Sequence, residues 1–129
     1  MKIPSELRYT KTHEWVRRQG ERELVVGITE HAQEELKDVV FVELPPVGKQ
    51  VKAGEAVAVV ESVKAAFDIY APVSGTIATV NAQLGSKPQL VNQDAYGEGW
   101  FFAIAPSQPG EWEQLMSAGD YAKTFQVST

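Results

Sequence analysis

Lys64 is the residue of this chain whose placement most clearly suggests chemistry. It follows the small and β-branched run 56–60 and precedes the alternating segment 67–70, so the flanking segments predict a β-hairpin with the lysine at its tip. There its four-carbon stem would hold an amine clear of the fold. A rigid hairpin with one exposed lysine suits a covalent attachment point for a swinging cofactor. The alternative is a lysine that only keeps an exposed turn in water.

The apolar residues of the two segments predict how this hairpin is paired. Pairing Glu61 with Ala66 brings apolar side chains of both strands onto one face. The pairs expected on that face are Val60 with Phe67 and Ala58 with Ile69. One face of the hairpin would then anchor it to the rest of the molecule.

The elements that must position this hairpin are mostly strands. The pattern predicts strands over residues 9–16, 24–28, 39–44 and 100–104, a turn followed by a strand over 73–80, a loop over 81–99, and a β corner between Gly48 and Gly54. A short helix follows Thr29 as its N-cap, and a C-terminal helix begins at Pro109 and ends at Gly119. We therefore expect a single domain over residues 1–129, a mainly β-sandwich or flattened barrel with short peripheral helices.

Composition excludes several classes of function. The 129 residues carry 17 acidic and 12 basic side chains, a net charge of −5 without a basic stripe, which argues against nucleic acid or an anionic membrane as a partner. No run approaches a membrane span, and residues 1–6 lack the features of a signal or transit peptide, which favours a bacterial-type cytoplasmic protein. Cysteine is absent, so any sulfur chemistry must be carried by an attached group.

The other motifs do not build an active site. His13-Glu14 resembles the start of a zinc-protease motif, but Arg17 stands where the second histidine would be, and His31 has no ligand partner at a useful spacing. Residues 97–99 lack the context of a nucleotide-binding loop, and no nucleophile elbow is present. We expect no metal site and no catalytic residues, hence a protein that is not an enzyme.

Six separated blocks, in order, resemble the glycine cleavage system H protein family, and the resemblance extends from about Leu7 to Tyr121. The blocks are residues 12–16, 26–33, 40–45, 60–65, 70–75, and 90–92 together with 96–100. The resemblance implies a flattened β-barrel or hybrid sandwich of the biotinyl/lipoyl-carrier type, with a lipoyl group in amide linkage to Lys64. It implies a carrier that shuttles the aminomethyl group of glycine.

The resemblance also implies four partners for a chain that is itself not an enzyme and is expected to be a monomer. A pyridoxal-phosphate glycine decarboxylase loads the lipoyl arm. A tetrahydrofolate-dependent aminomethyltransferase unloads it, and a flavin-containing dihydrolipoamide dehydrogenase reoxidises it. A lipoylating enzyme installs the group, and Glu61, three residues before the lysine, is the residue expected to guide that enzyme.

The resemblance further implies a surface cleft that shelters the loaded arm. A carboxylate there would hold the cationic aminomethyl nitrogen, and the candidates are Glu14 and Asp68, with Thr12 as a hydrogen-bonding group. Thr12 stands where the family commonly has serine. Phe67 is bulkier than the residue often found at its position, so it would crowd the base of the arm.

Three other functions remain to be weighed. A lipoyl or biotinyl module of another complex is one, but Val63 and Ala65 are not the methionines that usually flank a biotinyl lysine. An H-like scaffold that relays lipoyl groups to other acceptors is not separated from the carrier by sequence. An independent enzyme is disfavoured by the motifs above.

Overall fold

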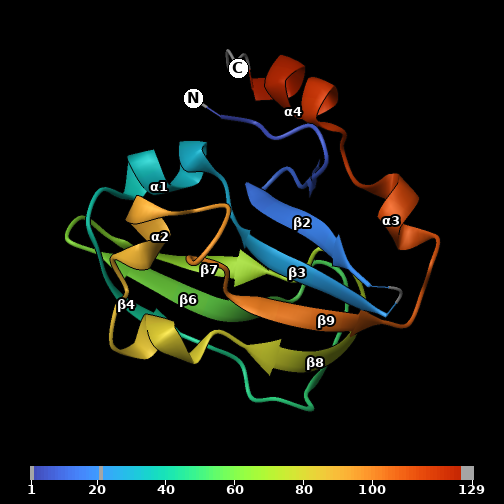
Figure 1. The fold of residues 1–129 in the computed structure, drawn as a ribbon, viewed down its shortest axis with the longest axis horizontal. Coiled ribbons are helices and arrows are strands. Elements are labelled where there is room, and N and C mark those ends of the chain that lie inside the picture. The colour runs from blue at the N-terminus through green and yellow to red at the C-terminus, as the bar shows by residue number, and fades with distance from the viewer. Residues whose placement is uncertain (1, 21, 126–129) are drawn as a thin grey trace.

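The computed structural model describes residues 2–20 and 22–125, which form two antiparallel sheets (Figure 1). The larger sheet has the strand order β1-β2-β3-β9-β8-β5. Its strands are β1 Arg8–Tyr9, β2 Glu14–Gln19, β3 Glu23–Ile28, β5 Gln50–Val51, β8 Gly75–Val80 and β9 Phe102–Pro106. The smaller sheet has the order β4-β6-β7, with β4 Val39–Glu43, β6 Ala56–Ser62 and β7 Ala66–Tyr70.

Short helices lie at the edges of these sheets (Figure 1). They are α1 Glu30–Leu36, the 3-10 helix η1 Ala82–Gly85, α2 Leu90–Gln93, α3 Glu111–Gln114 and α4 Ala118–Phe125. The expected mainly β fold with short peripheral helices, one of them at the C-terminal end, is confirmed. Among residues 2–20 and 22–125, no helix has the length and apolar character needed to cross a membrane.

Alternation along the strands of the larger sheet divides the buried residues into two clusters. Val16 and Val26 face the main core, which fills the space between the two sheets. Trp15 and Val25 point to the opposite face and pack in a second cluster with the N-terminal segment and Tyr121 of α4. The sheet is therefore covered on both faces along β2 and β3.

The first predicted strand is wrong as one element. Residues 9–16 are interrupted by a turn, and the segments on either side of it, β1 and β2, pair with each other, with Tyr9 opposite Trp15. The turn closes because the Thr10 N–H donates to the Glu14 carbonyl at 3.0 Å and His13 adopts a left-handed φ of 72°. Since histidine adopts that region only occasionally, the apolar pattern could not reveal the turn.

The predicted C-terminal helix is also wrong in its bounds. It consists of α3 and α4, which are separated where the backbone of Met116 exchanges two hydrogen bonds of 2.8 Å with Tyr9. Gly119 lies inside α4 instead of ending a helix. The division of the C-terminal helix arises from the contact of Met116 with the distant Tyr9, which overrides local helix propensity.

The predicted loop over residues 81–99 contains η1 and α2, and the last strand begins at Phe102 instead of Trp100.

The start of the first helix agrees with the sequence. The Thr29 hydroxyl accepts the Ala32 N–H at 3.2 Å, so Thr29 is the N-cap that was predicted for α1. The two glycines of the β corner, Gly48 and Gly54, both have positive φ, of 93° and 88°. They let the chain turn tightly on either side of β5 before it enters the β6–β7 hairpin.

Candidate functional site

The turn between β6 and β7 presents Lys64 to solvent. Ser62 closes this turn: its N–H donates to the Ala65 carbonyl at 2.8 Å, and its hydroxyl accepts the N–H groups of Lys64 and Ala65 at 3.1 and 3.2 Å. The Lys64 side chain is exposed, and no carboxylate of the described residues lies within 4.0 Å of its ammonium. The backbone is thus held while the amine stays free to react.

The predicted register of this hairpin is confirmed. Glu61 is opposite Ala66, and the next apolar pairs are Val60 with Phe67 and Ala58 with Ile69. Val60, Ala58 and Ile69 are buried, so three of the four apolar residues anchor the hairpin to the core. Phe67 differs, since 48% of its surface is exposed and its ring stands at the wall of a groove.

Glu61 lies on the outer face of the smaller sheet. It pairs with Ala66 on one side and with Phe41 of β4 on the other, and Phe41 is half exposed. Val63, directly before the lysine, is also exposed. An exposed carboxylate and two exposed apolar side chains thus lie on the hairpin and the strand beside it, on surface that an enzyme could reach.

A groove of about 310 Å³ lies beside the hairpin, between β7, α1 and the turn before β2. Thr12 and Asp68, two of the residues expected in an arm cleft, line it, together with Phe67. The rest of its wall is Lys11, His13, Ile28, Ala32, Glu35, Leu36, Val60, Ile69 and Tyr70. The floor is mainly apolar and the rim carries charge, which suits a long alkyl arm that ends in a polar group.

Glu14, the third expected cleft residue, does not line this groove. It is 1% exposed and borders a neighbouring hollow with Thr10, Thr12 and Tyr70. Its carboxylate accepts hydrogen bonds from the hydroxyls of Thr10 and Thr12 and, at 3.2 Å, from the Tyr70 N–H. Burial raises the pKa of Glu14, and these hydrogen bonds act in the opposite direction because they favour the anion. Thr12 and Tyr70 belong to both hollows and connect Glu14 to the groove.

Sequence reasoning missed the cluster of side chains behind the groove. His13 Nδ1 lies 2.6 Å from the Tyr121 hydroxyl, which lies 2.9 Å from the Thr29 hydroxyl. The centres of the His13 and His31 rings lie 4.5 Å apart with their planes tilted by 30°, and the centre of the Phe125 ring of α4 lies 4.5 Å from that of His13. Burial and the neighbouring His31 lower the pKa of His13.

The cluster could not be predicted because its members are far apart in the sequence. His13 and Tyr121 are 108 residues apart, and the partner at helical spacing, Glu35 in its 3.1 Å pair with His31, points to neither of them. The described residues hold no group of three or more histidine, aspartate or glutamate side chains placed to bind a metal ion. The cluster instead fixes the turn that carries Thr12 and Glu14 against α4.

Comparison with known proteins gives one family. The profile of the family described as Glycine cleavage H-protein matches residues 7–128. The chain is 58% identical to the glycine cleavage system H protein of Pseudoalteromonas translucida over 123 residues, 95% of each chain, and 58% identical to that of Shewanella loihica over 119 residues, 92% of each.

A solved structure agrees with these relatives. The crystal structure of a glycine cleavage system H protein from Mycobacterium marinum superposes with a TM-score of 0.86 at 38% sequence identity, covering 95% of this chain and 98% of that one. The similarity therefore extends over the hairpin, the groove and both sheets.

Proposed function

Because the chain belongs to the glycine cleavage H-protein family, whose members carry a covalent lipoyl-lysine, we propose that Lys64 is the residue that bears the lipoyl group. The protein is a lipoyl carrier of the glycine cleavage system and not a catalyst. Membership of that system gives it the decarboxylase, the aminomethyltransferase and the dihydrolipoamide dehydrogenase as partners.

The observation that carries this proposal is the exposed Lys64 amine on a turn closed by Ser62. The β6 and β7 strands below it are anchored by buried residues, so the attachment point is rigid while the attached arm can move. The lipoyl group would supply the sulfur chemistry that a chain without cysteine lacks, accepting and releasing the aminomethyl cargo.

The groove fits the arm that this lysine would carry. Acylation removes the charge of Lys64 and takes the formal balance of the chain from −5 to −6, so an uncharged arm could lie against the apolar floor. Asp68 lies in the groove wall, where its carboxylate would attract a cationic cargo. Glu14 acts from the adjoining hollow, where it fixes the Thr12 hydroxyl and adds a second negative charge.

Glu61 has a different task in this proposal. Its exposed carboxylate, three residues before the lysine and beside Phe41 and Val63, would be recognised by the lipoylating enzyme, the fourth partner.

We further propose that the carrier works as a monomer in the bacterial cytoplasm, in keeping with its bacterial relatives. A relay role, in which the lipoyl group passes to other acceptors, would use the same lysine.

The experiment is the intact mass of the protein isolated from cells that contain lipoate and a lipoylating enzyme. We expect one added lipoyl group, which disappears in Lys64→Arg and remains in Lys87→Arg, a matched change at another exposed lysine. Glu61→Gln should be lipoylated more slowly than the parent, whereas Glu43→Gln, an exposed carboxylate on β4, should not differ. A lipoyl group that survives Lys64→Arg would refute the assignment.

A further inference from the structure

The arginines of this chain are concentrated in one place. All four lie between residues 8 and 22, and residues 1–22 carry six basic against three acidic side chains, a net of +3. Residues 23–129 carry six basic against fourteen acidic side chains, a net of −8. An acidic protein thus keeps its guanidinium groups on β1, β2 and the turn that follows β2.

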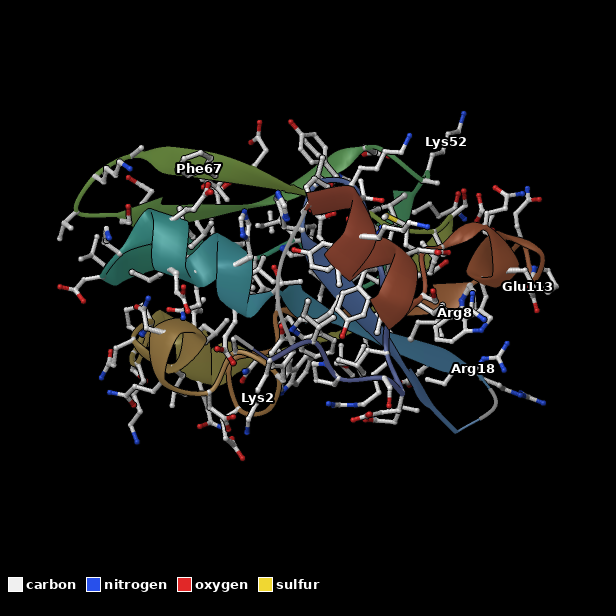
Figure 2. All side chains as sticks on the ribbon, turned by 90° about the horizontal axis from the view of Figure 1, so that it is seen from above. Lys2, Arg8, Arg18, Lys52, Phe67 and Glu113 are labelled. Carbon is white, nitrogen blue, oxygen red and sulfur yellow. The ribbon has the colours of Figure 1, made fainter. Side chains whose placement is uncertain are left out.

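Two of these arginines stack on one indole ring. The Arg8 Cζ lies 5.5 Å and the Arg18 Cζ 4.6 Å from the centre of the Trp112 ring. Arg8 is opposite Val16 across β1 and β2, and Val16 and Arg18 are two residues apart on β2, so both arginines emerge on the same face of the sheet. α3 places Trp112 over that face, and Figure 2 shows Arg8 and Arg18 together at one end of the molecule.

Most of the hydrogen-bonding capacity of this pair is unused within the described residues. Arg8 donates one N–H to the Leu115 carbonyl at 3.2 Å, and the Arg18 side chain donates none. The ion pairs found in residues 2–20 and 22–125 involve histidine or lysine and no arginine. Stacking occupies the flat face of a guanidinium and fixes its plane, which leaves the N–H groups at its edge directed outward.

A hollow of about 340 Å³ adjoins the stacked pair. Arg18 and Trp112 form part of its wall, and Leu24, Val73, Pro106 and Pro109 make other parts of it apolar. Glu23 also lines it, at more than 4.0 Å from either guanidinium. The site therefore offers a recess with an apolar part directly beside donors that suit a carboxylate.

This end of the molecule is far from the lysine hairpin. The C-terminal end of β2 and the turn between β6 and β7 lie at opposite ends of the longest axis (Figure 1), and Figure 2 shows Arg18 and Phe67 in opposite halves of the molecule. A protein bound at the arginines would leave Lys64 and the groove accessible. Contact at two separate places raises the effective concentration of the arm at its destination.

We propose that Arg8, Trp112 and Arg18 form a docking site, the arginine clamp, for an acidic segment of one of the three glycine cleavage enzymes. The segment presents a carboxylate to the guanidinium edges and an apolar side chain to the adjoining recess. The net negative charge of residues 23–129 repels the same segment elsewhere on the molecule, so the clamp selects one docking orientation.

The test is the dissociation constant of the unmodified chain for each of the three enzymes, so the result does not depend on lipoylation of Lys64. The variant is Arg8→Gln/Arg18→Gln. Its control is Lys52→Gln/Lys87→Gln, which removes the same charge from two exposed residues outside the clamp. We expect binding to one enzyme to weaken about tenfold in the arginine variant at low salt and less at high salt, and to change less than twofold in the control.

A second variant separates the clamp from simple positive charge. Arg8→Lys/Arg18→Lys keeps both charges but loses the planar fork, so it should bind clearly more weakly than the parent. The proposal is overturned if this variant binds like the parent, if the glutamine variant binds all three enzymes normally, or if the parent binds none. It is also overturned if the variants alter only the self-association of the chain in sedimentation, because the occupant would then be a second copy.

Discussion

At the scale of single residues, the Thr29 hydroxyl has two tasks. It caps α1 by accepting the Ala32 N–H, and it pairs with the Tyr121 hydroxyl, which also meets His13. His13 in turn occupies the left-handed backbone conformation that directs Thr12 and Glu14 to their two hollows. A few side chains thus decide where the groove has its polar groups.

The first prediction concerns His13 and pH. In the folded chain, burial and His31 lower the pKa of His13 below its ordinary value of 6.5. Just below pH 6.5, the unfolded state therefore binds more protons than the folded state. Stability should therefore fall as the pH falls from about 6.5 toward the folded pKa. Asparagine tolerates a positive φ, so His13→Asn can keep the turn while it removes this proton site.

The measurement is the melting temperature of parent and variant between pH 7.5 and 5.5. The melting temperature of the parent should fall more over this range than that of His13→Asn. The difference between the two melting temperatures should therefore narrow as the pH falls. His31 and Glu35 face the same ring and stay in both proteins, so their effects largely cancel. Parallel melting curves would show that His13 does not carry the pH dependence.

The second prediction concerns the two carboxylates near the groove. Asp68 lines the groove and Glu14 does not, so Asp68→Asn should shorten the lifetime of the loaded arm directly, by about twofold to fivefold, as expected for one partly exposed charge. Raised salt should reduce the effect. Glu14→Gln should act through Thr12 and change the lifetime at all salt concentrations.

The readout is the release of ammonia from the loaded protein without partner enzymes. Asp94→Asn, an exposed carboxylate that lines neither hollow, is the control and should leave the lifetime unchanged. A normal lifetime in Asp68→Asn would remove that residue from the site.

At the scale of elements, β2 and β3 depend on a close approach between one glycine and one tryptophan. A Cβ at Gly27 would lie 2.5 Å from the Trp15 ring, and the Trp15 Nε1–H donates to the Ala95 carbonyl at 2.9 Å. The Trp15 ring is thus held by two contacts. Gly27 lies opposite Trp15 across the two strands, and Ala95 accepts the indole N–H. The pair therefore joins the larger sheet to the loop after α2.

The third prediction is that Gly27→Ala destabilises the fold by roughly 1–3 kcal/mol, because the ring cannot move away without losing its hydrogen bond. Chemical denaturation should show a lower midpoint with an unchanged slope. Gly85→Ala, where an added Cβ meets nothing within 4 Å, is the control and should be nearly neutral. Equal midpoints for the two variants would mean that the packing is not tight.

At the scale of the whole molecule, the C-terminal helix is connected to the groove from behind. Tyr121 of α4 is fully buried, stacks on Tyr9 at 4.8 Å and meets His13 and Thr29 through its hydroxyl. Figure 1 shows α4 beside the N-terminal segment, far from the β6–β7 turn. The N-terminal segment and α4 thus jointly support the turn at residues 10–13, while the lysine hairpin stands apart from them.

The fourth prediction is that Tyr121→Ala costs about 3–5 kcal/mol and loosens the turn at residues 10–13 selectively. Native-state hydrogen exchange should show faster exchange for the amides of residues 10–14 and little change at Ser62 and Ala65. Tyr121→Phe, which keeps the ring and removes only the hydroxyl, should have a smaller effect of the same kind. Equal acceleration throughout the chain would mean that the molecule responds as one unit.

Local patterns in the sequence were enough to predict the hairpin, its register, the position of Lys64 at its tip and the cap at Thr29. These features follow from alternation and capping within a few residues, and the structure agrees with them. The order of blocks along the chain was sufficient to indicate the family, which the comparisons establish.

Other features of the fold and the site could not be predicted from local patterns. The turn at residues 10–13, the division of the C-terminal helix and the separation of Glu14 from Asp68 depend on contacts between residues as far apart as His13 and Tyr121. Such contacts leave no periodic signal in the sequence, because their partners come from unrelated elements. The same reason explains why Arg8, Arg18 and Trp112 became a site only when β1, β2 and α3 were brought together.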